Sequence, residues 1–148
     1  MCGLVGYLSN QNTLVAPDVL LSKMADCIAH RGPDDFGVWH DSKAGIGLAH
    51  RRLSVVDLSS AGHQPMHAAR GRYVMVFNGE IYNYSKLRSE LEASNHSLNW
   101  NGNSDTETLL AGFEEWGVEA TIQRSIGMFA IALWDKQTNT LTLARDRI

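Results

Sequence analysis

The second residue of the chain is a cysteine, and its position gives it an unusual pair of reactive groups. If Met1 is removed, Cys2 becomes the chain terminus and carries both a thiol and a free α-amino group. A thiol has a pKa of about 8.5 and is mostly protonated at neutral pH, whereas an α-amino group titrates at about 7.7–8.0 and can act as its base. This pairing suits acyl transfer. A retained Met1 would turn the amine into an amide, so the hypothesis depends on processing.

A second candidate is the Asn78-Gly79 pair, which has two interpretations. Taken alone, the dipeptide favours a tight hairpin turn, because both residues tolerate a positive φ. In the functional interpretation, the Asn78 side-chain NH₂ and the Gly79 backbone N–H form an oxyanion hole. Reactions that pass through a tetrahedral intermediate need such a donor pair.

Two charged residues of opposite sign form a third candidate site. Arg52 precedes an apolar segment, and a guanidinium can clamp a carboxylate through two hydrogen bonds. Asp105 lies in the first turn expected of a helix, where the helix dipole stabilises a carboxylate and where it can also hold an ammonium group. Together they can bind both ends of an α-amino acid. The alternative is that both are ordinary surface charges.

Other potential sites are weaker. His63 and His67 have H-x-x-x-H spacing, but Pro65 between them disfavours the helix that a metal site of this form requires. The chain has no Gly-rich phosphate-binding loop of the G-x-x-x-x-G-K-[ST] form. Cys27 shares a helical face with Leu20, Leu21, Met24 and Ile28, so it is expected to be a small core residue.

The composition is that of a globular domain with one core. The 148 residues are 44% hydrophobic and 20% charged, and the net charge of −3 gives no reason to expect a nucleic-acid or anionic-membrane partner. No apolar run is long enough to cross a bilayer, and two cysteines do not make a disulfide framework. The expected compartment is the cytoplasm, where a working thiol stays reduced.

The hydrophobic pattern predicts alternating strands and helices. A helix is expected from Pro17, a residue suited to the first helical turn, and another from Ser104, which opens an S-x-x-E capping box. Shorter helices are expected at 85–93 and 118–124, an extended segment at 51–57 and a loop at 59–72. Strands are expected at 3–9, 36–40, 46–50, 73–77, 80–83, 128–134 and 140–146. Hairpin turns between strand clusters indicate layered, mostly antiparallel sheets.

Several blocks of sequence occur in an order that resembles a known family. They are Met1-Cys2-Gly3, 30–34 (HRGPD), 49–54 (AHRRLS) with 57–59 (DLS), Gln64-Pro65, 78–83 (NGEIYN), 104–107 (SDTE) and 127–130 (GMFA). The ordered set resembles the glutaminase domain of the class II glutamine amidotransferases, and specifically the asparagine synthetase branch. Each block is modest alone, but the set spans essentially the whole chain.

The resemblance implies a fold and a reaction. The fold is that of N-terminal-nucleophile hydrolases, an α+β fold with two mostly antiparallel sheets between helical layers in the order αββα. The reaction is hydrolysis of glutamine to glutamate and ammonia. Carried over residue by residue, Cys2 would be the nucleophile through a glutamyl thioester, and Asn78 and Gly79 would form the oxyanion hole.

The same resemblance assigns the substrate contacts. Arg52 would bind the α-carboxylate of glutamine, and Asp105, helped by Glu80, would hold its α-ammonium group. Backbone groups around Leu53 and Val55 would line the site.

The resemblance also implies what lies outside these residues. Residues 1–148 would form one glutaminase domain that lacks its last segment, and an absent synthetase domain, in cis or in trans, would use the ammonia to amidate aspartate. No cofactor is expected in this segment, since ATP and Mg²⁺ belong to the synthetase domain. Glutamine is the expected small-molecule partner, and a homodimer is a further assembly to consider.

Two alternatives remain open from the sequence. The chain can be the glutaminase domain of another ammonia-using synthetase, with a sugar or peptide carboxylate as acceptor, because these enzymes differ in the acceptor domain. It can also be a non-catalytic module that binds glutamine or docks to a synthetase.

Overall fold

The computed structural model describes residues 2–9, 15–53 and 60–147, which form two sheets between two helical layers. The first sheet has the strand order β1-β3-β2, with β1 (Gly3–Leu8), β2 (Asp35–Asp41) and β3 (Ile46–Arg52). The second has the order β4-β5-β6-β7, with β4 (Met66–His67), β5 (Tyr73–Ile81), β6 (Gly127–Asp135) and β7 (Thr140–Arg145). All pairings between these strands are antiparallel.

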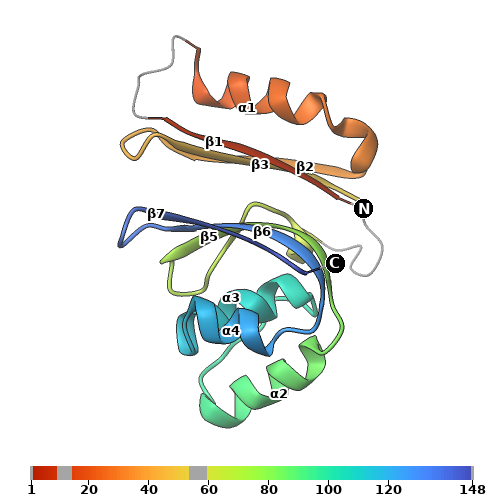
Figure 1. Cartoon of the computed structure of the whole chain (residues 1–148), viewed down its shortest axis with the longest axis vertical. Coiled ribbons are helices and arrows are strands. Elements are labelled where there is room, and N and C mark those ends of the chain that lie inside the picture. Colours follow the sequence, from red (N-terminus) through yellow and green to blue (C-terminus); the bar gives the residue numbers. More distant parts are fainter. Residues whose placement is uncertain (1, 10–14, 54–59, 148) are drawn as a thin grey trace.

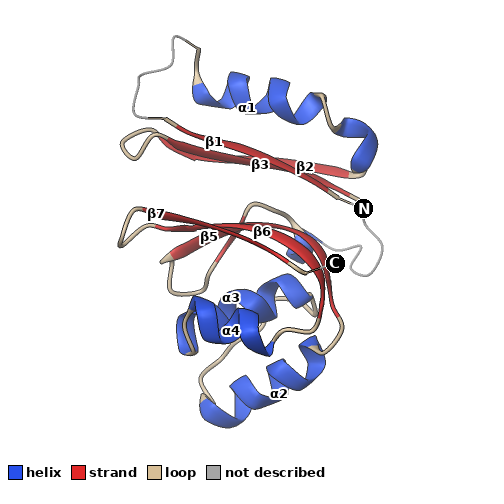
Figure 2. Cartoon of the chain, in the orientation of Figure 1, coloured by secondary structure: helices blue, strands red, loops and turns tan. Residues whose placement is uncertain are grey.

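The helices lie on the outer faces of the two sheets. They are α1 (Pro17–Asp26), α2 (Tyr84–Ser94), α3 (Asp105–Glu115) and α4 (Val118–Arg124), with short 3₁₀ turns η1 (Ala29–Arg31) and η2 (Ser60–Gly62). Helix α1 covers the first sheet, whereas α2, α3 and α4 lie against the second (Figure 1). Figure 2 shows the resulting order of helix, sheet, sheet and helices. The predicted αββα fold class is confirmed.

Side-chain alternation along the strands decides which residues face the space between the sheets. In β5, Met75 and Phe77 pack in the core beneath the helices, whereas Val74 and Val76 pack against the first sheet. Leu4 of β1 belongs to the same inter-sheet core. Continuing this alternation puts four predicted site residues on the inter-sheet side: Cys2, Arg52, Asn78 and Glu80.

The N-terminus of α3 is fixed largely as the capping-box pattern predicted. The Ser104 side-chain oxygen accepts a hydrogen bond from the Glu107 N–H at 3.2 Å. The Glu107 carboxylate accepts instead from the backbone N–H groups of Asn101 and Gly102, at 2.7 and 3.1 Å. The preceding loop is thereby tied to the first turn, and Asp105, the first residue of α3, has a defined position.

The turn predicted at Asn78-Gly79 is wrong. Both residues lie inside β5, where they pair with Ala130 and Phe129 of β6. The glycine is required by a close approach between strands, because a Cβ at Gly79 would lie 2.2 Å from the Met128 carbonyl oxygen. The sequence signal for a flexible residue was real, but its cause is crowding within a sheet.

The prediction for Cys27 is also wrong. Cys27 follows the last residue of α1 and keeps helical backbone angles, but the helical phase places it nearly opposite Ala25, away from the face that buries Leu21 and Ala25, and it is exposed. Its Sγ donates to the Lys23 carbonyl oxygen at 3.4 Å. The loop predicted at 59–72 contains η2 and the two-residue strand β4. The turn predicted at 10–13 lies outside the described residues. Of the extended segment predicted at 51–57, residues 51 and 52 belong to β3 and residues 54–57 lie outside the described residues.

None of the helices in the described part of the chain is long and apolar enough to cross a membrane.

Candidate active site

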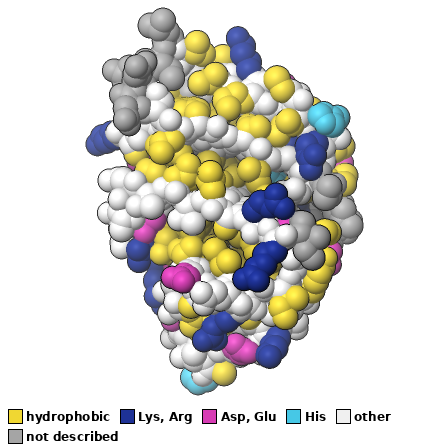
Figure 3. Space-filling model, in the orientation of Figure 1, with side chains coloured by type: hydrophobic (Ala, Val, Ile, Leu, Met, Phe, Trp, Pro, Cys, Tyr) yellow, Lys and Arg dark blue, Asp and Glu magenta, His cyan; other side chains and the backbone are white. Residues whose placement is uncertain are grey.

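A cavity of about 590 Å³ opens between the two sheets, where the apolar inter-sheet core ends. Along β5 the inter-sheet positions change from Val74 and Val76 to Asn78 and Glu80, so the packed core gives way to polar groups. Figure 3 shows hydrophobic side chains gathered across the middle of one face of the molecule, beside Lys or Arg side chains.

The cavity brings together every predicted site residue that the structure describes. These residues come from two strands, one helix and the residues next to β1 and β3: Cys2, Arg52, Leu53, Asn78, Gly79, Glu80 and Asp105. Val55, the remaining one, lies outside the described residues. Residues far apart in the sequence thus share one space, as a substrate site requires.

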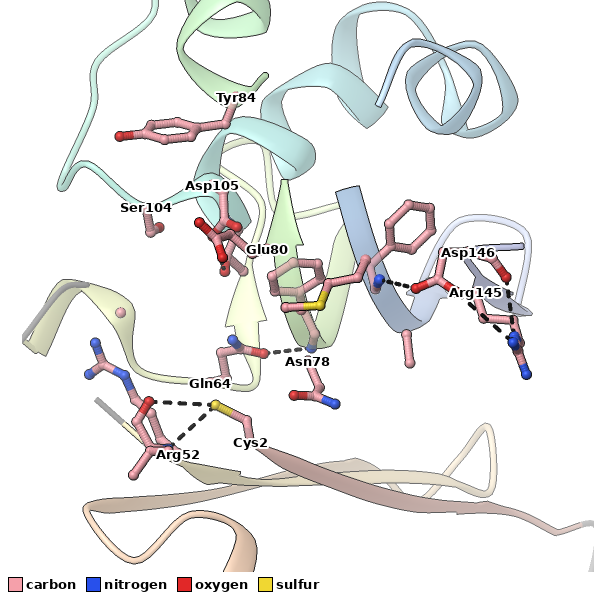
Figure 4. A pocket seen from close by; sticks show the side chains of 18 of the residues that line it. Cys2, Arg52, Gln64, Asn78, Glu80, Tyr84, Ser104, Asp105, Arg145 and Asp146 are labelled. Carbon is pink, nitrogen blue, oxygen red and sulfur yellow. Dashed lines mark hydrogen bonds and ion pairs between the residues drawn. The ribbon is translucent and has the colours of Figure 1, made fainter. Parts of the chain in front are cut away.

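Cys2 is half-buried at the start of β1, and backbone groups of Leu53 border its sulfur. The Leu53 N–H points to the Sγ at 3.4 Å, and the Leu53 carbonyl oxygen lies 3.7 Å away. The Arg31 Nε donates to the Cys2 carbonyl oxygen at 3.1 Å. In Figure 4, Cys2 and Asn78 extend from opposite sheets into the same space. The thiol is therefore accessible from the cavity.

Arg52 ends β3 and is largely buried, with its guanidinium against η2. A Cβ at Gly62 would lie 2.1 Å from Arg52 Nη2 and 2.7 Å from Cζ, so only a glycine leaves room for this packing. Burial acts to raise the pKa of Asp35, but hydrogen bonds from His63 and the Phe36 N–H lower it, and the charge of the Arg52 guanidinium adds a smaller lowering effect. Arg52 thus supplies a positive charge to the wall of the cavity.

The edge of β5 beside the cavity has a regular arrangement of backbone donors. The Phe77 N–H donates to Gln64 Oε1 at 2.6 Å, and the Ile81 N–H donates to Asp105 Oδ2 at 3.0 Å. Amides two and four residues apart in a strand point the same way, so the Gly79 N–H points toward the cavity edge between them. Gly79, with the Asn78 side chain beside it, can present two N–H donors to one oxygen atom.

Two carboxylates converge on another part of the cavity wall. Burial raises the pKa of Asp105, and the charge of Glu80 raises it further, while hydrogen bonds from the Ile81 and Thr106 N–H groups act in the opposite direction. Figure 4 shows Asp105 and Glu80 close together. A bound cation between the two carboxylates would relieve the repulsion between their charges, so this part of the cavity suits an ammonium group.

Sequence reasoning missed other residues that line the cavity. Met128, Phe129 and Ala130 of β6 form one wall, and Gln64 lies between Cys2 and β5. Gln64 was part of the recognised Gln-Pro block, but no periodicity links a loop residue to a strand 13 positions away. Within residues 2–9, 15–53 and 60–147, no three His, Cys, Asp or Glu side chains are grouped as metal ligands.

Comparison with known proteins identifies the family. The family model described as glutamine amidotransferase domain matches residues 1–148. The chain belongs to this family. This glutamine amidotransferase domain is 42% identical over 148 residues to asparagine synthetase [glutamine-hydrolyzing] 1 of Bacillus subtilis, and 39% identical over 158 residues to a putative asparagine synthetase [glutamine-hydrolyzing] of Mycobacterium bovis.

These matches cover 99% of this domain but only 22% and 24% of the two relatives. The domain therefore spans about a quarter of the length of the curated proteins it resembles. A solved structure, glutamine phosphoribosylpyrophosphate amidotransferase from Bacillus subtilis, superimposes with a TM-score of 0.69 over 98% of this chain and 36% of that one. At 16% identity, this likeness supports the fold alone.

Proposed function

We propose that this domain hydrolyses glutamine to glutamate and ammonia, with Cys2 as the nucleophile. The observation that carries the proposal is the shared cavity, in which the Cys2 thiol from one sheet and the Asn78-Gly79 donors from the other border the same space. A nucleophile opposite two N–H donors is the arrangement that addition to an amide carbonyl requires.

The substrate is held by opposite charges that line the cavity. The Arg52 guanidinium takes the α-carboxylate of glutamine, because its planar donors match a carboxylate. Asp105 and Glu80 take the α-ammonium group, whose positive charge offsets the repulsion between them. Backbone groups of Leu53 border both the thiol and this site, and those of Val55 are assigned the same role. The side-chain amide then extends toward Cys2.

The reaction proceeds in two displacements once Met1 has been removed. The Cys2 α-amino group takes the thiol proton, the sulfur attacks the side-chain amide carbon, and the carbonyl oxygen becomes an oxyanion held by Asn78 and Gly79. The C–N bond then breaks, and the leaving nitrogen takes the proton from the α-ammonium group of Cys2 and departs as ammonia. Water attacks the resulting thioester, its proton passes to the α-amine, and the C–S bond breaks to give glutamate and the free thiol.

The ammonia serves a synthetase partner in this proposal. The supporting observation is that both curated relatives carry the words asparagine synthetase and glutamine-hydrolyzing in their names while being about four times longer than this chain. The partner unit, in cis or in trans, would use ATP and Mg²⁺ to activate aspartate for amidation. The proposed site contacts only glutamine and not the molecule that receives the ammonia. An ammonia acceptor other than aspartate is therefore compatible with the same glutamine site.

The decisive experiment labels the nucleophile and measures turnover in parallel. Protein shown by mass spectrometry to lack Met1 is treated with a chloroketone analogue of glutamine, and the adduct is mapped by peptide mass. We expect one adduct at Cys2, its prevention by glutamine, and glutamate release that is lost in Cys2→Ser. Cys27→Ser is the matched control, since this exposed thiol lies outside the cavity and its removal is expected to change neither result. An unlabelled Cys2, or turnover that survives Cys2→Ser, would refute the proposal and favour a glutamine-binding module.

A further inference from the structure

The two halves of the proposed site belong to different sheets. Two buried side chains, those of His50 and Gln64, both contact the backbone of one residue, Phe77. Phe77 precedes Asn78 in β5. Its N–H donates to Gln64 Oε1 at 2.6 Å, and its carbonyl oxygen lies 3.0 Å from His50 Nε2. His50 is 1% exposed and Gln64 is 6% exposed, so neither contact competes with bulk water.

These contacts replace a missing strand partner. Strand β4 pairs with β5 only through Met66–Met75 and His67–Val74. If the pairing continued, Gln64 would lie opposite Phe77, but β4 does not extend beyond Met66. The Gln64 side chain takes the bond that the next backbone carbonyl of a longer strand would have made, and β5 keeps its geometry up to Asn78.

Gln64 is itself fixed to the sheet that carries Cys2. A Cβ at Gly37 of β2 would lie 2.1 Å from the Gln64 carbonyl oxygen, so the Gln64 backbone packs directly on β2. His50 belongs to β3 of the same sheet. The His50 side chain therefore runs from the first sheet to the Phe77 backbone of the second, and the Gln64 side chain reaches the same backbone from a loop that packs on the first sheet; Figure 4 shows this for Gln64.

From this geometry we propose that Gln64 is a positioning residue for the oxyanion hole, which rests on the proposed glutaminase function. By holding the Phe77 N–H, Gln64 sets where the Asn78 side chain and the Gly79 N–H lie relative to the Cys2 sulfur. It acts through the backbone of β5 and touches no reacting atom. Loss of the Gln64 acceptor displaces the N–H donors that are needed in the transition state. It leaves in place Arg52 and Asp105, which are proposed to bind the α-carboxylate and α-ammonium groups of glutamine.

The test is a double-mutant cycle in kcat between Gln64→Met and Asn78→Ala. Methionine keeps the length of the side chain and removes the acceptor. Because the Phe77 N–H then loses its buried acceptor, we expect Gln64→Met to lower kcat about tenfold with KM changed less than about twofold. In the Asn78→Ala background the same substitution is expected to lower kcat by clearly less than tenfold, because only the Gly79 N–H then remains for Gln64 to position. Losses that multiply in the double variant, or a loss confined to KM, would overturn the proposal.

Amide hydrogen exchange gives a readout that does not depend on activity. In Gln64→Met, exchange at Phe77 N–H is expected to accelerate about tenfold and the side-chain NH₂ signals of Asn78 to shift, whereas Gln64→Glu keeps an acceptor and protects Phe77. Gln123→Met, at an exposed position on α4, is the matched control and leaves kcat and exchange unchanged. If the native chain lacks turnover, the glutaminase proposal is refuted, but the proposal that Gln64 positions Phe77 and Asn78 is not. The positioning proposal is then decided at Phe77 and Asn78, where unchanged exchange and NH₂ signals would refute it.

Discussion

The buried histidine between the sheets predicts how folding stability depends on pH. Burial of the His50 ring, together with the charges of Arg52 and His63, lowers its pKa from 6.5 to about 4, although the Phe77 carbonyl and Asp35 favour the protonated ring. The ring is therefore neutral in the folded domain near pH 7. Its Nε2 carries the proton and donates to the Phe77 carbonyl oxygen.

The sign and size of the effect follow from linkage. Between pH 6.5 and 4 the unfolded chain binds a proton at His50 that the folded domain does not, so the free energy of unfolding falls as the pH is lowered. The contribution is fully present above pH 6.5 and is lost as the pH falls through this window. A difference of about 2.5 between the two pKa values corresponds to about 3 kcal/mol, of which about 2 kcal/mol is lost at pH 5.

Urea unfolding at pH 7.5 and pH 5.0, followed by tryptophan fluorescence, measures this loss. The matched variant is His50→Gln, which is uncharged at both pH values. Because the raised pKa values of Asp105 and Glu114 affect both proteins alike, we expect the native chain to lose about 2 kcal/mol more than the variant between the two pH values. Equal losses in the two proteins, or a His50 pKa near 6.5 in an NMR titration, would refute the reasoning.

Three further substitutions separate the proposed roles in steady-state glutaminase assays. Arg52→Lys is expected to raise the KM for glutamine by about tenfold or more with kcat nearly unchanged, because a point charge replaces a planar pair of donors. A purely catalytic defect would contradict the carboxylate role. Asn78→Ala is expected to lower kcat by about 10²–10³, and an effect on KM alone would argue against the oxyanion hole. Gly62→Ala is expected to raise KM by displacing the Arg52 guanidinium, whose Nη2 would lie 2.1 Å from the new Cβ. Its urea midpoint should change little, because the end of a flexible side chain can move.

The sequence predicted elements whose signals are local. The spacing of apolar residues located the long helices, and Ser104 marked the start of α3, because a cap and its partner lie within one turn. The strand predictions at 3–9, 46–50 and 128–134 agree with β1, β3 and β6 to within two residues at each end. The candidate residues Cys2, Arg52, Asn78 and Asp105 were found through the ordered motifs, and the cavity brings them together.

The sequence did not predict contacts between segments that share no pattern. Asn78-Gly79 was predicted to be a turn because the backbone of β6, whose close approach requires a glycine at position 79, lies about 50 residues further along the chain. Gln64 was missed as a contact for the same kind of reason, since it lies in a loop and its partner is a backbone amide of β5, 13 residues further along the chain. Cys27 was misassigned because the spacing of apolar residues did not locate the centre of the buried face, which Leu21 and Ala25 define and which Cys27 lies opposite. Such facts depend on the three-dimensional arrangement of the elements.

The two-residue alternation of β5 has a consequence for how the chain can vary. Inserting or deleting one residue between Val74 and Asn78 would rotate the rest of the strand by half a turn. Asn78 and Glu80 would then point under the helices, and the Phe77 ring would enter the space where glutamine is proposed to bind. Length changes are therefore expected to be confined to hairpin ends such as 136–139, where an added residue leaves the strand phase intact.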